Sequence, residues 1–454
     1  MLETIERFAK SSNFISFLDR FFFRRPYFQI IKKTFLELKH IETLSVSEKA
    51  ELQKQKMLAL LNHASANCPY YNDLFLRHDI EIKSLDNLSK IPFLTKEIIR
   101  KYGRQMVARN TERMFLVKRN TGGSTGEPLE FYSDADACAV DLAHHKFLYD
   151  LMGYEPGDVI AGGAGIAIPR SHRDRGIYWV KRSKYSIWWH LCYSALYLNE
   201  QSIKFYIEHL LETKPSILRG YPSFWDTIAG YLLAHNIRIN FKVKGANLSA
   251  EICLDMQKER IEKAFNTKVF LEYGQSELTV FCYTNGSSSM YQTAPLYGYI
   301  EVVKDNGEQA KLGEEGEIIA TSLCNRGMPF IRYKTGDRAV VSHRKGGMVW
   351  FERFEGRTQD YVFDKNNQKI ALTALIFGQH FRALKNIIKW QFQQNQAGHV
   401  VIKIVKGPFY AEEDEREIID KIQSSACIDL SFSYEDYISL SKNGKFLFLI
   451  QNCQ

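Results

Sequence analysis

The sequence has no apolar run that approaches the roughly 20 residues of a membrane-spanning helix. Its N-terminus lacks the apolar stretch and cleavage site of a signal peptide. The eight cysteines are scattered, with no Cys-x-x-Cys pair, which favours reduced, packed thiols over disulfides. We therefore expect a cytoplasmic protein without a transmembrane segment, with the inner face of the membrane as an alternative location.

The sequence also has little excess charge. Its net charge is +8 over 454 residues, and the excess is spread along the chain. Such a balance favours anionic ligands weakly and argues against a nucleic-acid partner. The chain is longer than a single core usually grows, so we expect more than one domain.

The order of the expected elements divides the chain into three parts. Residues 1–110 are expected to be the helical N-terminal part of a large domain, because segments such as Ser47–Ala64 repeat apolar positions at intervals of three and four. Residues 111–355 alternate short strands with helices, which favours an α/β nucleotide-binding part. Residues 356–454 are predicted to form a small α+β lid with β-β-α-β order. The clearest strands expected in the large domain are Lys268–Tyr273, Tyr297–Val303, Glu317–Ser322 and Met348–Phe354.

Residues 20–33 mix aromatic side chains with arginine and lysine. This composition suits peripheral contact with a membrane surface. A helix packed on the main body is the favoured alternative.

The sharpest local feature is a loop rich in glycine and hydroxyl side chains. Its members are Thr121, Gly122, Gly123, Ser124, Thr125 and Gly126. The glycines let backbone N–H groups approach an anion, and the hydroxyl groups add donors, so the loop can wrap phosphate. No Lys-Ser or Lys-Thr follows the last glycine, which argues against a P-loop NTPase. Taken alone, a tight turn between two strands explains the loop equally well.

A second feature ends the expected strand at Tyr273. An aromatic ring beside Gly274 and Gln275 can stack on a flat base, and Ser276 adds a hydroxyl group. Glu277 at the carboxyl end of a strand offers the oxygen ligand that Mg²⁺ prefers. An ordinary strand that ends in a turn is the alternative.

Three further motifs carry charge on expected turns. Asp337, within Arg332–Arg338, can accept hydrogen bonds from a ribose diol, and the flanking cations would keep it ionised. Arg357 follows Gly356 at the expected domain boundary, and Lys445 lies on a loop with Gly444. Both cations can bind phosphate oxygens. For either one taken alone, an ordinary cation on the protein surface is the alternative.

Taken together and in this order, the five motifs resemble the core motifs of the acyl-adenylate-forming superfamily. Further segments resemble the phenylacetate–CoA ligase-like branch and, within it, the CapK-like group of capsular polysaccharide biosynthesis proteins. These segments are Leu61–Ala64, Cys68–Tyr71, Ile91–Lys96, Arg219–Ser223 and Gly444–Phe446. The resemblance covers nearly the whole chain.

The resemblance implies an ATP-dependent, AMP-forming ligase that uses Mg²⁺. A carboxylate would attack the α-phosphorus of ATP, release pyrophosphate, and pass its acyl group to an amine, a thiol or a sugar-linked acceptor, in surface polysaccharide biosynthesis. Two alternatives stay open: a nucleotidyltransferase that leaves AMP on a non-carboxylate acceptor, and a non-catalytic nucleotide-binding scaffold.

The resemblance also implies a role for each motif residue. Thr121–Gly126 would hold the β- and γ-phosphates, Ser276 the α-phosphate and Glu277 the Mg²⁺. Asp337 would bind the ribose hydroxyls with Arg357 nearby, and Lys445 would bridge the carboxylate and the α-phosphate. The nucleotide would also contact Tyr273, Gly274, Gln275, Ser249, Ala250 and Glu251.

One of these assignments is less direct. Ala250 stands where relatives more often carry glycine, so the loop at residues 249–251 is a weaker match.

Two further segments, Ile187–His190 and Arg219–Ser223, are candidates for the acyl pocket. For the tryptophan pair, a packed core is the alternative.

Overall fold

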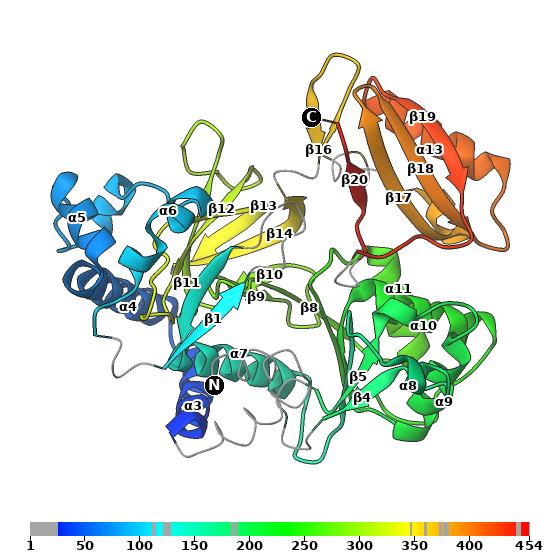
Figure 1. Cartoon of the computed structure of the whole chain (residues 1–454), viewed down its shortest axis with the longest axis horizontal. Helices are drawn as coiled ribbons and strands as arrows, with labels where there is room; N and C mark the ends of the chain where they lie inside the picture. The colour runs from blue at the N-terminus through cyan, green and yellow to red at the C-terminus, as the bar shows by residue number, and fades with distance from the viewer. Residues whose placement is uncertain are drawn as a thin grey trace.

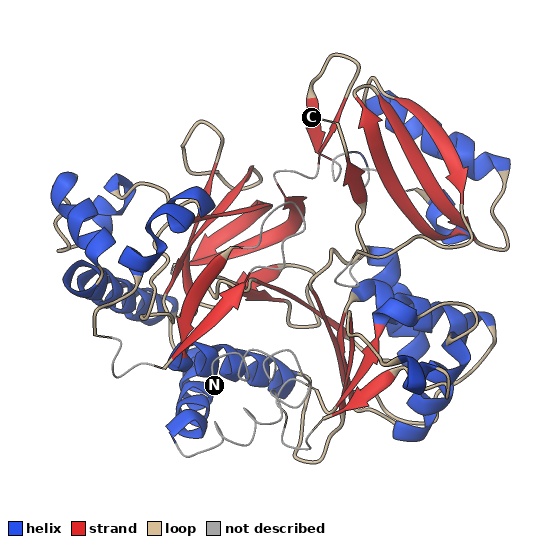
Figure 2. Cartoon of the chain, viewed as in Figure 1, coloured by secondary structure: helices blue, strands red, loops and turns tan. Residues whose placement is uncertain are grey.

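The computed structural model describes residues 26–110, 115–120, 129–182, 186, 189–345, 347–357, 361–371, 375, 381–441 and 446–453. They form a large body around a twelve-stranded sheet and a smaller body around a four-stranded sheet (Figure 1). The large body combines helices with strands (Figure 2), which confirms the mixed α/β class. Among the described residues, no helix is both long and apolar enough to cross a membrane. All eight cysteines are free thiols.

The N-terminal part is helical, as predicted. Its elements are α3 (Pro26–Thr43), α4 (Val46–Asn67), α5 (Pro69–Arg77), η1 (Leu85–Lys90) and α6 (Lys96–Met106). Helix α4 begins at Ser45, where a capping box forms with Glu48, and Pro69 opens α5. Helix α3 packs Ile31 against Ala139 and Ala143 of α7 (Ala135–Leu151). The packed helix is therefore confirmed from residue 26 onward, whereas residues 20–25 lie outside the described part and membrane contact stays a prediction.

The twelve-stranded sheet has a parallel half and an antiparallel half. Its strands are β3 (Ile160–Ala164), β4 (Trp179–Lys181), β5 (Leu191–Ser194), β6 (Ile217–Gly220), β7 (Gly245–Ser249), β8 (Val269–Gly274), β9 (Phe281–Tyr283), β10 (Tyr291–Thr293), β11 (Gly298–Val303), β12 (Glu315–Ser322), β13 (Tyr333–Lys345) and β14 (Met348–Arg357). Their order is β11-β12-β13-β14-β10-β9-β8-β7-β6-β3-β5-β4. Strands β5, β3, β6, β7 and β8 are parallel neighbours, and the direction reverses between β8 and β9.

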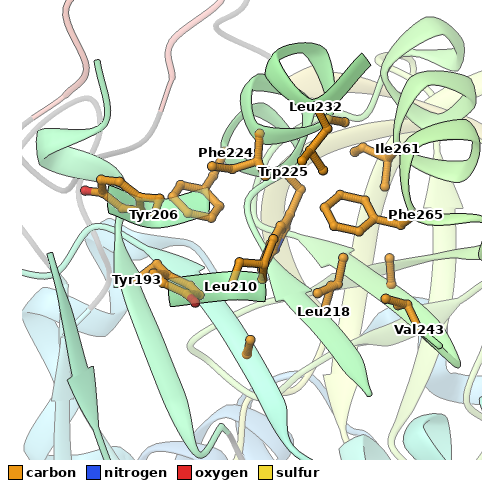
Figure 3. Packing of buried hydrophobic residues seen from close by; sticks show 14 of the residues in the cluster. Tyr193, Tyr206, Leu210, Leu218, Phe224, Trp225, Leu232, Val243, Ile261 and Phe265 are labelled. Atoms are coloured by element: carbon orange, nitrogen blue, oxygen red, sulfur yellow. The ribbon is translucent and has the colours of Figure 1, made fainter. Parts of the chain in front are cut away.

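Helices α8 (Arg170–Arg173), α9 (Ile203–Thr213), α10 (Pro222–Ala234) and α11 (Asp255–Phe265) accompany the parallel half. Trp225 of α10 is fully buried there beside Phe224 and Phe265 (Figure 3). Gly220, between β6 and α10, has φ +112°, and a Cβ at this position would lie 2.1 Å from the carbonyl oxygen of Gly163. A side chain is therefore excluded at this turn, and α10 can begin directly against the sheet.

Strands β1 (Leu116–Asn120) and β2 (Glu130–Asp134) pair antiparallel on either side of the glycine-rich loop. Asn120 lies opposite Glu130 in this pair. The segments before and after the loop are therefore strands, and their facing ends are held close together. The loop itself, Thr121–Gly126, lies outside the described residues.

The four-stranded sheet of the small body has one more strand than the predicted β-β-α-β unit. The expected elements are β17 (Ile387–Gln396), β18 (His399–Lys406), α13 (Glu412–Ser425) and β19 (Asp429–Tyr434). In addition, β20 (Leu449–Gln451) pairs parallel to β17 and gives the order β19-β18-β17-β20. The hairpin of β15 (Tyr361–Phe363) and β16 (Lys369–Ala371), with η4 (Arg382–Asn386), completes the body. The boundaries expected at residues 110 and 355 stay predictions.

The prediction of a tight turn at Arg332–Arg338 is wrong. Most of this segment lies in β13, and Asp337 pairs with Arg357 of β14. Gly336 has φ +76°, so it bends the backbone inside the strand without ending it. The Gly-Asp pair, a common turn signal, marks this bend.

Arg332 anchors the N-terminal helical part to the sheet. Its Nε and Nη2 donate to the two carboxylate oxygens of Glu301 at 2.9 and 3.0 Å. Its Nη1 donates to the carbonyl oxygens of Ser89 and Ile91. Both partners of this ion pair are 6% exposed, so the pair is bidentate and shielded from water.

We expect Glu301→Gln to lower the free energy of unfolding by about 3 kcal/mol, because the Arg332 charge would stay buried without a partner. Urea unfolding followed by circular dichroism measures this loss. The matched control is Glu81→Gln, which breaks the exposed pair with Lys83 and should leave the midpoint unchanged. Equal effects of the two changes would show that Arg332 is not an anchor.

Candidate functional site

Among the described residues, the predicted positions 273–277 lie at the carboxyl end of β8 and in the turn that follows it. This end lies where the parallel half of the sheet meets the antiparallel half. In open α/β sheets, ligands bind outside the carboxyl ends of strands. The end of β7 lies alongside, with Ser249 opposite Glu272 of β8.

Asp337 of β13 is held by two side chains from the β8 region. Its Oδ2 accepts hydrogen bonds from the Tyr273 hydroxyl group and from Nε2 of Gln275, each at 2.7 Å. Gln275 is oriented in turn by Thr279, which donates to its Oε1 at 3.0 Å. The structure therefore brings Asp337 to two residues that lie more than 60 positions earlier in the sequence.

The cations that flank Asp337 in the sequence have acidic partners of their own. Arg332 pairs with Glu301, and Arg338 pairs with Glu315 and Asp305. The expectation that these cations keep Asp337 ionised stays a prediction.

One face of the Tyr273 ring stacks on Phe354 of β14, with ring centroids 4.1 Å apart and an interplanar angle of 29°. Tyr291 contacts Phe354 edge-on at 4.6 Å. Burial, followed by the nearby charge of Asp337, raises the pKa of Tyr273 well above its ordinary value. The Tyr273 hydroxyl group is thus a neutral donor at physiological pH.

Glu277 lies in the turn after β8 and is 8% exposed. Burial raises its pKa, although a hydrogen bond from the Tyr333 hydroxyl group to Oε1, at 2.9 Å, partly opposes this effect. The next residue, Leu278, has φ +55°, and its carbonyl oxygen accepts from the Ser322 hydroxyl group at 2.7 Å. A carboxyl group in this position would bind a cation favourably, because a cation offsets the cost of burying its negative charge.

Arg119 connects the glycine-rich loop to this turn. Its Nη1 donates to the carbonyl oxygen of Ser276 at 3.1 Å, and the loop begins two residues later. The Ser276 residue is exposed. The end of β1 and the Ser276–Glu277 turn are therefore neighbours in space.

In the segment at residues 249–251, Ala250 is exposed, whereas Glu251 contacts other parts of the chain. Ser249 ends β7, and Ala250 is exposed with φ +72°, a conformation that glycine adopts most easily. The carboxylate of Glu251 accepts hydrogen bonds from the backbone N–H groups of Ser223 and Phe446. Contact of these residues with a nucleotide stays a prediction.

Several predicted residues cannot be placed. Thr121–Gly126 and Lys445 lie outside the described residues, as do Ile187 and Trp188. Arg357 ends β14 opposite Asp337 in the strand register, and its side chain lies outside the described part. Trp189 packs against Gly162 of β3, which agrees with the packed-core alternative for this residue.

A buried ionic cluster beneath the site is absent from the sequence-based prediction. Glu272 Oε2 accepts from Asn247 at 2.7 Å and contacts Nδ1 of His145 at 3.2 Å, and Arg219 lies 3.8 Å from Oε1. Burial would raise the pKa of Glu272, but the charges of His145 and Arg219 and the hydrogen bonds lower it to about 2. The sequence feature that indicates this cluster is a carboxylate inside an otherwise apolar strand.

We expect Glu272→Gln to destabilise the protein by about 3 kcal/mol at neutral pH. The folded pKa of about 2 lies below the ordinary value of 4.5, so the carboxylate stabilises the fold above pH 4.5 and loses this contribution as the pH falls toward 2. Unfolding free energies of wild type and variant should therefore converge over this range. The control Glu208→Gln, at an exposed position of α9, should match wild type throughout, and a constant gap for Glu272→Gln would contradict the assignment.

Comparisons with known proteins agree with this geometry. Residues 363–452 match the model of the CapK C-terminal domain. The chain is 24% identical to Protein CapK of Staphylococcus aureus over 452 residues, which cover 96% of each protein. It is 23% identical to a phenylacetate-coenzyme A ligase of Escherichia coli, over 72% of this chain and 75% of the ligase.

Solved structures show the same fold at low sequence identity. A 2-hydroxyisobutyryl-CoA ligase in the postadenylation state aligns with a TM-score of 0.70 and 16% identity over 90% of both chains. The GH3.15 acyl acid amido synthetase aligns with a TM-score of 0.58 and 15% identity over 88% of both chains. The predicted resemblance is confirmed: the chain is a relative of CapK and of the phenylacetate-coenzyme A ligases, and it has the fold of the acyl-adenylate-forming ligases.

Proposed function

We propose that this protein is an ATP-dependent adenylate-forming ligase. The observation that carries the proposal is the hydrogen bond from Arg119 to the Ser276 carbonyl oxygen. It places Arg119, two residues before the glycine-rich loop in the sequence, beside a turn with a buried carboxyl group and close to the Asp337 cluster. Phosphate, metal and ribose contacts are needed within the length of one nucleotide, and these three features supply them together.

In the proposed reaction, the oxygen of a substrate carboxylate attacks the α-phosphorus of ATP. The bond between the α-phosphorus and the bridging oxygen breaks, and pyrophosphate leaves with that electron pair. The acyl-adenylate then transfers its acyl group to a nucleophile and releases AMP. The residues act mainly by position and charge, because the transferred groups carry the covalent changes.

The described residues fit their proposed roles. Asp337 would bind the ribose hydroxyl groups, and Tyr273 and Gln275 hold its carboxylate in place for them. Glu277 would hold Mg²⁺, which commonly takes one or two carboxylates together with phosphate oxygens and neutralises charge on them. Its buried, hydrogen-bonded carboxyl group suits this role. Thr121–Gly126, Ser276, Arg357 and Lys445 would bind the phosphates and ribose, and Ser249 and Ala250 the adenine side.

The class of acceptor follows from the relatives. The phenylacetate-coenzyme A ligases and the 2-hydroxyisobutyryl-CoA ligase favour a thiol, and the acyl acid amido synthetase favours an amine. A sugar-linked acceptor and a role in surface polysaccharide biosynthesis rest on the similarity to CapK.

A screen of carboxylic acids and amino acids for pyrophosphate release tests this proposal. At least one acid should support exchange of labelled pyrophosphate into ATP. A broad panel that supports no exchange would contradict the proposal. Mass spectrometry of the product separates a ligase, which releases free AMP, from a nucleotidyltransferase that leaves AMP on its acceptor.

We expect Lys445→Ala to lower the rate of adenylate formation by about 10²–10³-fold, because one preorganised charge at the reacting phosphate contributes about this much. Pyrophosphate exchange at saturating ATP measures the change. Lys442→Ala removes a cation from the same loop and serves as the matched control, with activity close to wild type. Full activity of Lys445→Ala would favour the scaffold hypothesis.

A further inference from the structure

The chain segment that follows Lys445 is attached to the large body through Glu251. The backbone N–H of Phe446 donates to Oε1 of Glu251 at 2.8 Å, and the backbone N–H of Ser223 donates to Oε2 at 3.1 Å. In Figure 1, the segment between β19 and β20 passes between the four-stranded sheet and helices α10 and α11. One carboxylate therefore connects the end of β7, the first turn of α10 and the small body.

The position of Ser223 favours a charged carboxylate at Glu251. Ser223 is the second residue of α10, so its N–H group belongs to the helix end, where backbone donors point outward and negative charge is stabilised. Hydrogen bonds from neutral donors to a charged acceptor are stronger than those between neutral groups. The two backbone donors thus hold Glu251 in one orientation.

Lys389 of β17 provides a positive charge from the small body. Its Nζ lies 5.4 Å from the centre of the Phe446 ring. Burial raises the pKa of Glu251, and the charge of Lys389 is a smaller effect in the opposite direction. Asp226 of α10 is the second carboxyl group nearby, and it pairs with Arg260 of α11 at 3.4 Å. An amine of the small body and carboxyl groups of the large body thus lie near Phe446.

The hydrogen bond to Phe446 acts directly on the position of Lys445. Because the peptide bond is planar, the N–H of Phe446 and the Cα of Lys445 belong to one rigid unit. A partner that fixes this N–H therefore restricts the backbone from which the lysine side chain extends. No other contact of the described residues lies closer in sequence to Lys445.

We propose that Glu251 is a positioning residue, which holds Phe446 and thereby places Lys445 for adenylate formation. This inference rests on the proposed function. Glu251 and Phe446 lie on different bodies, so rotation of the small body would break the bond. The 2-hydroxyisobutyryl-CoA ligase aligns better in its postadenylation state, with a TM-score of 0.70, than in its thioesterification state, with 0.55. The bond thus belongs to an arrangement resembling the first of these states.

Hydrogen–deuterium exchange tests the contact without any knowledge of the substrate. In Glu251→Ala, peptides that begin several residues before Phe446 and include its N–H group should exchange at least several-fold faster than in wild type, because the backbone N–H loses its acceptor. Glu251→Gln keeps a carbonyl acceptor and should give an intermediate rate. Glu259→Ala, at an exposed position of α11, is the matched control. Exchange unchanged by both Glu251 variants would overturn the proposal.

The half-reactions test the role in catalysis, with the acid that the screen identifies. We expect Glu251→Ala to lower the turnover rate of pyrophosphate exchange by about 10²-fold, the cost of a misplacement near 1 Å, with little change in KM for ATP. Glu251→Gln should recover part of this loss. Acyl transfer from acyl-adenylate supplied to the enzyme should keep its wild-type rate.

Other outcomes would contradict the proposal in distinguishable ways. An equal loss in both half-reactions would show a structural role for Glu251, and no loss in either would show that Lys445 does not depend on it. A screen without any active acid would overturn the proposed function and, with it, the catalytic role of Glu251. Hydrogen exchange would then still decide whether the carboxylate holds Phe446.

Discussion

The Asp337 carboxylate joins the two halves of the twelve-stranded sheet. Asp337 lies on β13 and Tyr273 on β8, and β14, β10 and β9 separate these strands in the hydrogen-bonded order. A direct bond between them requires the sheet to curl, and the Phe354 ring of β14 fills the space against Tyr273. The site exists because this curl brings a carboxylate of the antiparallel half to the end of a parallel strand. Arg332 secures the first residues of the same strand through Glu301, Ser89 and Ile91.

Much of the fold could be predicted because its signals are local. Strands such as β8, β17 and β18 are short runs of apolar and β-branched residues, and the helix at Glu412–Ser425 is the helix expected in the β-β-α-β unit. Strand β20 was missed because three residues carry too little pattern, and its pairing with β17 is a tertiary contact. The bend at Gly336 was taken for a turn, since glycine beside aspartate signals both.

The site could be predicted as a set of residues but not as a set of contacts. The ordered motifs marked Tyr273, Gln275 and Asp337, yet nothing local shows that one carboxylate oxygen accepts from both other side chains. Arg332 was expected to keep Asp337 ionised, but its partner is Glu301, 31 residues away. The contacts of Glu272 and Glu251 were not predicted, for the same reason. Their partners come from other segments, and an ion pair between distant segments leaves no periodic pattern in the sequence.

The buried ionisable groups of this protein differ in the strength of the interactions by which they hold its parts together. The pair of Arg332 and Glu301 has both carboxylate oxygens occupied and lies within the large body, so breaking it would leave a buried charge, at a cost of about 3–5 kcal/mol. Glu251 joins the two bodies through a single backbone donor of Phe446. A hydrogen bond to a charged group contributes about 1.5–3 kcal/mol, equivalent to a shift of about 10–10² in an equilibrium between two arrangements. A bond of this size is strong enough to favour one arrangement and weak enough to be exchanged for other contacts within a catalytic cycle. Under the proposed function, the pair of Arg332 and Glu301 would persist through the cycle, and the bond to Phe446 would break when the small body turns.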